Sequence, residues 1–133
     1  MTYRNILTIG AILGILFGLG FILVPAGLLS MYNVDLNAAG LVIAQLYGTA
    51  LLGFGLVNWL ARGVNDEGAK QAIVTGNLVG DAIGFVVSLI GQLGGATGVN
   101  ALGWSTVLIY LLLTAGFAYL RFGPRQSTMP ATR

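Results

Sequence analysis

Four long runs of apolar residues constrain this chain more than any other feature. They cover residues 6–29, 41–61, 72–93 and 102–120. Each is close to the roughly 20 residues that an α-helix needs to cross the hydrocarbon core of a bilayer. Backbone groups in lipid must be paired within a helix or a closed barrel, and barrel strands would be about 10 residues long with alternating polarity, which these runs lack. The sequence therefore predicts an all-α, up-and-down bundle of four transmembrane helices.

The scarcity of charges supports this fold. Of the 133 residues, 56 % are hydrophobic and only 8 % are charged. A soluble domain this small has a large surface for its volume and needs more charges to cover it. We therefore expect a single lipid-embedded domain over residues 1–121 and a disordered cytoplasmic tail over residues 122–133. The first run is too long for the apolar region of a cleaved signal peptide, so we expect it to be retained as a helix.

Positive charges are confined to one set of helix ends. Segments 30–40 and 91–101, which join helices on one side of the membrane, contain no Lys or Arg. All six cations lie near the other ends of the runs: Arg4, Arg62, Lys70, Arg121, Arg125 and Arg133. The positive-inside rule then places both termini in the cytoplasm, in a multi-pass protein of the cell inner (plasma) membrane. Charges placed in this way do not form a nucleic-acid surface, so we expect no nucleic-acid partner.

The residue types that carry most enzyme chemistry are missing. The sequence has no Cys and no His, which excludes thiol nucleophiles, Ser-His-Asp triads and Cys/His zinc sites. One acid, Asp81, lies inside an apolar run without a second acid or base beside it. Paired-carboxylate and metal-assisted hydrolysis need more than one such group. We therefore expect no catalytic residue, no metal site, no cofactor and no enzymatic activity.

Asp81 is the residue most at odds with its surroundings. It lies near the middle of the third run, where a carboxylate costs about 2.5–3.5 kcal/mol on insertion scales. No Lys or Arg lies at this depth, so desolvation favours the neutral acid. Three interpretations are open: Asp81 relays a proton or cation, it anchors the polar group of an apolar ligand, or it hydrogen-bonds neighbouring helices as structural glue.

Polar side chains at similar depth complete a candidate intramembrane site around Asp81. Gln45 and Thr49 in the second run, and Tyr110 and Thr114 in the fourth, are its expected partners. Asn58 and Asn77 lie nearer the cytoplasmic side, and we expect them to hydrogen-bond to each other across the second and third helices. The Met and aromatic residues are expected to serve packing.

Glycines recur at helical spacing in three of the runs. They are Gly10, Gly14 and Gly18 in the first run, Gly48 and Gly55 in the second, and Gly76, Gly80 and Gly84 in the third. Small residues on one face allow another helix backbone to approach closely, as in a glycine zipper. Tight packing inside one bundle is the simpler explanation, and a homo-oligomer interface is the alternative.

Local signals indicate where the helices begin and bend. Asn65, followed by two acids, can cap the third helix, and Asp35 or Asn37 can cap the second. Pro25 lies in the last turns of the first run and is expected to kink it.

Two segments suggest a family. The run PAGLLSMYNVDL at 25–36 and the run AQLYGTALLGFGLVNWLAR at 44–62 resemble small four-helix bacterial membrane proteins of unknown function, near the DoxX-like and ergosterol-28-like families. The resemblance implies a four-helix bundle with a scaffold or accessory role. We expect a non-enzymatic accessory or scaffold subunit that packs against lipid, itself or a larger membrane complex. The alternative is a small proton-coupled transporter, or a carrier of a lipophilic small molecule, that uses Asp81.

Overall fold

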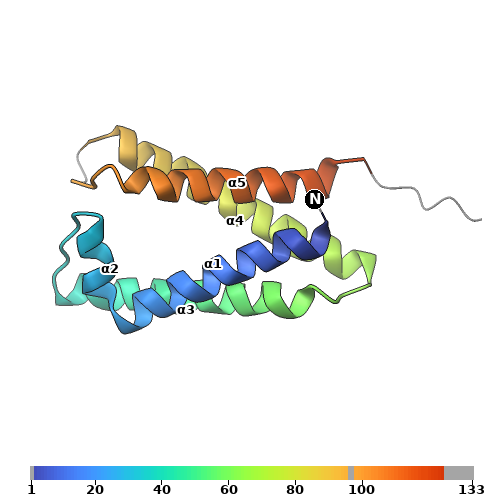
Figure 1. Ribbon diagram of the computed structural model, residues 1–133, viewed down its shortest axis with the longest axis horizontal. Coiled ribbons are helices and arrows are strands. Elements are labelled where there is room, and N and C mark those ends of the chain that lie inside the picture. Colours follow the sequence, from blue (N-terminus) through green and yellow to red (C-terminus); the bar gives the residue numbers. More distant parts are fainter. Residues whose placement is uncertain (1, 96–97, 125–133) are drawn as a thin grey trace, which may run out of the picture.

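Five α-helices make up the chain in the computed structural model, which describes residues 2–95 and 98–124 (Figure 1). They are α1 (Tyr3–Leu23), α2 (Pro25–Met31), α3 (Ala38–Ala61), α4 (Glu67–Leu93) and α5 (Gly103–Phe122). Helices α1, α3, α4 and α5 are long and apolar enough to cross a membrane. The prediction of an all-α chain with four long apolar helices is confirmed. The predicted tail falls mostly on residues 125–133, which lie outside the described residues.

The outer surface of these helices is apolar. Large side chains such as Leu60 and Ile90 are 77 % and 66 % exposed, and many others on all four long helices are similarly uncovered. Soluble monomers rarely expose contiguous apolar surface on this scale. These are the properties of an integral membrane protein with four candidate spans.

Pro25 divides the first apolar run, and the prediction of one kinked helix over residues 6–29 is wrong. Helix α1 ends at Leu23, and Val24 leaves helical geometry with φ −137° and ψ 53°. Proline disfavours helical geometry in the residue before it, and it has no N–H to donate the next backbone hydrogen bond of the helix. Pro25 instead begins α2, where the first N–H of a helix needs no partner. Helix α2 therefore turns away from the axis of α1 at its end instead of extending it (Figure 1).

Side-chain caps set the beginnings of α3 and α4. The Asn37 side chain accepts a hydrogen bond from Gly40 N at 2.9 Å, which selects Asn37 over Asp35 as the cap of α3. At α4 the cap is Asp66, one residue after the expected Asn65, and it accepts from Ala69 N at 2.7 Å.

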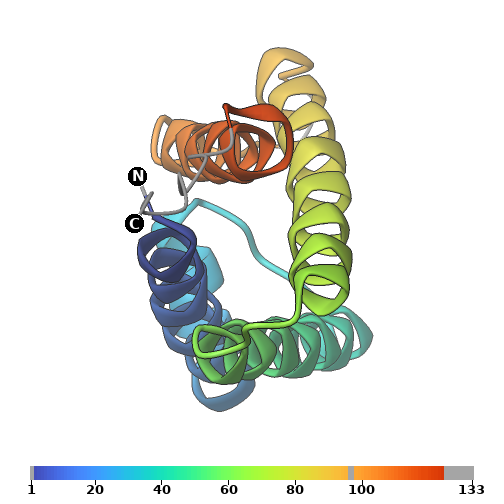
Figure 2. The same cartoon turned by 90° about the vertical axis from the view of Figure 1, so that its right-hand side faces the viewer.

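The four long helices form two close pairs. Helix α1 packs along α3 and α4 packs along α5, whereas α1 meets α5, and α3 meets α4, over far fewer residues. Seen along the long axis, the helices surround a central space, with α3 and α5 on opposite sides of it (Figure 2). The interior of this protein is therefore bounded by two helix pairs and is not filled by one evenly packed core.

Glycines bring the backbones of α1 and α3 together. A methyl group added at Gly18 would lie 2.6 Å from Leu52 N, and one added at Gly14 would lie 2.9 Å from the Gly55 Cα. A methyl group at Gly48 would lie 2.8 Å from the Gly18 carbonyl oxygen. These separations leave no room for a side chain, so the close contact of α1 with α3 depends on glycine.

The two pairs meet at the end that holds the start of α1 and the end of α5. A cluster of buried side chains joins them there: Ile6, Leu7, Ala61, Val74 and Phe117. Ile6, Leu7 and Phe117 are at most 2 % exposed, so this end is densely packed. We call this cluster the apolar plug.

The opposite end is closed by backbone and amide hydrogen bonds. Asn100 N and Nδ2 donate to the carbonyl oxygens of Tyr32 and Met31 at 3.1 and 2.9 Å. Asn33 adopts φ 60°, a conformation that Asn tolerates better than most residues, and its Nδ2 donates to Gly98 O at 3.0 Å. These bonds join the α2–α3 connection to the α4–α5 connection. We call this region the α2 end.

The close approach of α1 and α3 generates a stability prediction. Gly48→Ala should destabilise the fold by about 1–3 kcal/mol, because the added methyl overpacks a filled contact. Gly53→Ala, on the same helix, is the matched control, since a methyl there has no neighbouring atom within 4 Å. Denaturant titration in detergent micelles measures both, and equal midpoints for the two variants would contradict this account of the contact.

Candidate functional site

A cavity of about 500 Å³ lies between the two helix pairs. All four long helices line it, and its wall is mostly apolar, including Leu13, Phe17, Phe21, Leu51, Phe54 and Phe117. Phe117 belongs to the apolar plug, which bounds one end, while Tyr32 and Val34 of the α2 end border the other. The volume falls within the roughly 300–1,000 Å³ of typical small-molecule sites.

One face of each long helix supplies the cavity wall. The lining positions are 10, 13, 14, 17 and 21 on α1, and 47, 50, 51, 54 and 58 on α3. Spacings of three and four residues bring side chains to one side of a helix. The aromatic residues were expected to serve packing, and this lining surface was not predicted. The shared spacing of aromatic and polar residues is the signal that could have revealed it.

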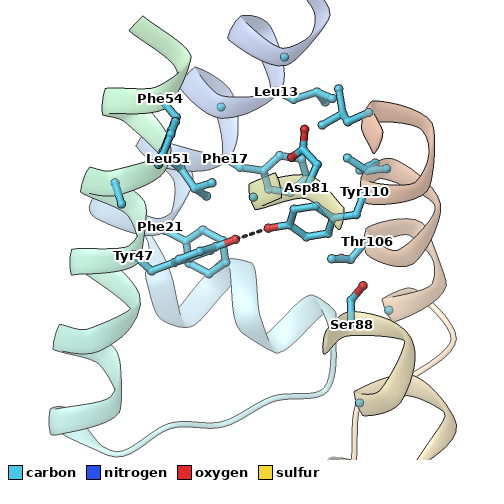
Figure 3. Close-up of a pocket in the computed structure, with 18 of the residues that line it drawn as sticks. Leu13, Phe17, Phe21, Tyr47, Leu51, Phe54, Asp81, Ser88, Thr106 and Tyr110 are labelled. Carbon is cyan, nitrogen blue, oxygen red and sulfur yellow. Dashed lines mark hydrogen bonds between the residues drawn. The ribbon is translucent and has the colours of Figure 1, made fainter. Parts of the chain in front are cut away.

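A tyrosine pair crosses the cavity. The hydroxyls of Tyr47 on α3 and Tyr110 on α5 are 2.8 Å apart and share a hydrogen bond between opposite helices (Figure 3). The Phe21 ring meets the Tyr47 ring edge-on, with centroids 5.3 Å apart. Gly84 makes room for Tyr110, because a methyl at that position would lie 2.5 Å from the ring. Tyr110 was expected in the site, but its partner Tyr47 was not.

Two asparagines link α3 to α4 beside the plug. Asn58 Nδ2 donates to Asn77 Oδ1, and Asn77 Nδ2 donates to Asn58 Oδ1, both at 2.9 Å. Asn77 Nδ2 also donates to Ile73 O at 2.9 Å, and Asn58 is only 3 % exposed. Gly10 leaves space for this pair, since a methyl there would lie 3.1 Å from Asn58 Nδ2. The expected hydrogen bond between Asn58 and Asn77 is confirmed, and both residues border the cavity.

Asp81 projects from α4 toward the space that Phe17 and Tyr110 border (Figure 3). Its Oδ2 atom is buried and has no hydrogen-bond partner among the described residues. The Tyr110 hydroxyl is bonded to Tyr47, and Thr114 Oγ1 is itself buried without a partner. Buried polar atoms are nearly always hydrogen-bonded, so an unpaired carboxylate oxygen beside a cavity indicates a place where a further group binds.

The other expected partners of Asp81 bond elsewhere. Gln45 Nε2 donates to Ile22 O at 3.1 Å, which adds a side-chain bond between α3 and α1. Thr49 Oγ1 donates to Leu46 O at 2.7 Å within its own helix. Of the four partners expected for Asp81, Tyr110 alone is among the residues that line the cavity with it, and Gln45 instead bonds α3 to α1.

The glycine rows of α1 and α4 differ in their surroundings. On α4, methyl groups added at Gly76 and Gly80 would meet no atom within 4 Å, in contrast to the crowded positions on α1. Gly80 borders the cavity and Gly76 is not among its lining residues. Within the described part of the chain, Asp81 is the one acidic residue in the cavity wall.

Comparison with protein-family models, with curated proteins and with solved structures gives no match for this chain. The resemblance to small bacterial four-helix proteins therefore stays a prediction, and the site is interpreted from its own geometry.

The asparagine pair generates a second prediction. Asn58→Ala and Asn77→Ala should each destabilise the protein by about 1–3 kcal/mol, because each removes both hydrogen bonds of the pair and leaves the remaining side-chain amide incompletely bonded. The double variant should lose less than the sum of the two, as expected for residues that bond to each other. Ser88→Ala is the control on α4, since Ser88 Oγ bonds within its own helix, to Phe85 O. Strict additivity in a denaturation cycle would argue against the pair.

Proposed function

We propose that this chain is a multi-pass protein of the plasma membrane that binds a lipophilic small molecule in its central cavity. The observation that carries the proposal is the mostly apolar space of about 500 Å³ with a few polar groups on its wall, Asp81 above all. Such a composition is typical of sites that bury an apolar ligand and orient it by a small number of polar contacts.

Packing alone gives no reason for this cavity. Protein interiors are packed at the density of organic crystals, and the side chains of the apolar plug are buried where the two helix pairs meet. Away from the plug the pairs enclose open volume instead, with an unpaired carboxylate oxygen beside it. A ligand in this volume would restore contacts to the apolar wall and supply the partner that Asp81 lacks.

Access from the bilayer fits the arrangement of the helices. The ends of the cavity are bounded by the apolar plug and by the hydrogen-bonded α2 end. The sides between α1 and α5, and between α3 and α4, are the least packed parts of the wall. A lipophilic molecule dissolved in the membrane can move between helices there without crossing water.

Orientation follows from the charges at the plug end. Arg4, Arg62, Lys70 and Arg121 all lie at this end of their helices. Arg62 stacks on Trp59 with its guanidinium carbon 3.3 Å from the ring centroid, an arrangement suited to the membrane interface. Under the positive-inside rule the plug faces the cytoplasm and the α2 end faces outward. The same orientation places both termini in the cytoplasm.

Ligand binding replaces the accessory or scaffold role as the leading interpretation. The accessory role was implied by the family resemblance, with glycine faces as the packing surfaces, and four of these glycines hold α1 against α3 within one chain. Four expectations stay predictions: membership of a larger complex, homo-oligomerisation, proton coupling and the lack of enzymatic activity. The cavity described above would serve this chain equally whether it is a carrier or a binding subunit.

A cavity-filling substitution tests the proposal. Gly80→Leu should abolish ligand binding, because its side chain would extend into open cavity space without a clash at its Cβ. Binding is measured by photolabelling of the purified protein in nanodiscs with diazirine-bearing dodecyl probes that carry hydroxyl, trimethylammonium or sulfate head groups. Labelled peptides are located by mass spectrometry, and saturable labelling is defined by competition with the unlabelled compound.

Gly76→Leu is the matched control for this experiment. It adds the same side chain one turn away on α4, at a position with equal space but outside the cavity wall. We expect saturable labelling in the wild type and in Gly76→Leu, and its loss in Gly80→Leu. If none of the three probes labels the cavity peptides saturably, or if the two variants behave alike, the proposal is wrong.

The orientation is tested by cysteine labelling, since the chain has no native Cys. Gly63→Cys, in the connection between α3 and α4, should resist a membrane-impermeant maleimide in intact cells. Asp35→Cys, in the exposed connection at the α2 end, should react. Both should react after permeabilisation, and the reverse pattern in intact cells would overturn the orientation.

A further inference from the structure

We infer that the ligand of the cavity is a lipophilic organic cation, an ammonium group on an apolar body, held by the Asp81 carboxylate and by surrounding aromatic faces. This inference rests on the proposed function and narrows its ligand to one chemical class.

The charges of the cavity wall favour a cation. Asp81 is the sole formally charged residue among the described lining residues, which include no Lys or Arg. A carboxylate in an apolar setting is stabilised by an opposite charge within a few ångströms. The protein provides no such charge near Asp81, and the Oδ2 atom has no donor among the described residues. A ligand that carries a positive charge supplies this charge, and a protonated amine also supplies the N–H donor that Oδ2 lacks.

Aromatic rings surround the same space. The lining residues include Phe17, Phe21, Tyr47, Phe54, Tyr110 and Phe117, contributed by α1, α3 and α5. The face of an aromatic ring is electron-rich and attracts ammonium groups, and quaternary ammonium ligands are recognised in this way by cages of such rings. Asp81 projects from the remaining helix, α4, toward this aromatic wall (Figure 3).

Anionic and neutral ligands would make fewer favourable contacts with Asp81 and the aromatic rings than a cation would. An anion would face the Asp81 carboxylate without any cationic side chain to offset the repulsion. A neutral alcohol could donate one hydrogen bond to Asp81, but the aromatic faces would then give it only apolar contact. The combination of one carboxylate with several rings is best matched by a cation that has an apolar body to fill about 500 Å³.

The experiment compares the three dodecyl photoprobes on the full chain in zwitterionic nanodiscs. We expect the trimethylammonium probe to label the cavity peptides at about tenfold lower concentration than the hydroxyl or sulfate probe. Asp81→Asn should remove this preference, so that the trimethylammonium probe labels the cavity peptides no better than the hydroxyl probe does. Asp81→Glu, which keeps the charge, should retain it. Asp35→Asn is the control for attraction to the protein surface, because it removes an exposed acid at the α2 end.

A measurement on the wild type guards against misfolding of the variants. Unlabelled dodecyltrimethylammonium should displace the hydroxyl probe at about tenfold lower concentration than dodecanol does. Equal labelling by the cationic and neutral probes, or a preference that survives in folded Asp81→Asn, would overturn the inference while ligand binding stands. Absence of saturable labelling by all three probes would overturn the proposed function itself.

Discussion

The close contact between α1 and α3 determines the shape of this protein. Gly14 and Gly18 on one helix, with Gly48 and Gly55 on the other, allow backbone to touch backbone. Between apolar helices in lipid there is no hydrophobic driving force, so such close van der Waals contact is a main source of association. Because α1 packs against α3 along this row, it meets α5 over only a short stretch. The second pair, α4 with α5, is therefore held apart from the first over most of its length.

This separation gives the interior two different ends and a hollow between them. At the plug end, buried Ile6, Leu7 and Phe117 fill the space between the pairs. At the other end, Asn33 and Asn100 join the two interhelical connections by hydrogen bonds. Between them, the hydrogen bond of the tyrosine pair reaches from α3 to α5 across a space that apolar side chains leave open.

Polar groups inside the protein differ in how completely they are paired. Buried Asn58 and half-buried Asn77 exchange two hydrogen bonds, and the two tyrosine hydroxyls share one. The Asp81 carboxylate has one oxygen that no described residue pairs, although burial of such a group is costly. The protein could have avoided this cost with an apolar residue at the same position. The proposed binding function gives a reason for an acidic residue with an unpaired oxygen beside a cavity of ligand size.

Part of this architecture could be predicted from residues alone. The four long helices follow from run length, and the asparagine pair follows from two amides at similar depth on neighbouring helices. The break at Pro25 was predicted only as a kink, because how the chain continues past a proline depends on what it packs against. The partners expected for Asp81 were chosen by depth, which says nothing about the direction in which a side chain points. Gln45 illustrates this, since it bonds to the Ile22 carbonyl on α1.

The sequence by itself determined that the chain is helical, apolar on its outside and charged mainly at one set of helix ends. These properties are local, since they depend on the composition of each segment and on the need to pair backbone groups in lipid. Only the tertiary structure decided which glycine row meets a neighbouring backbone and which faces open space, as Gly18 and Gly80 show. It also decided that the aromatic faces of three helices enclose one cavity with Asp81. These are relations between segments, set by the rotation of each helix about its axis, which the order of residues along one helix does not specify.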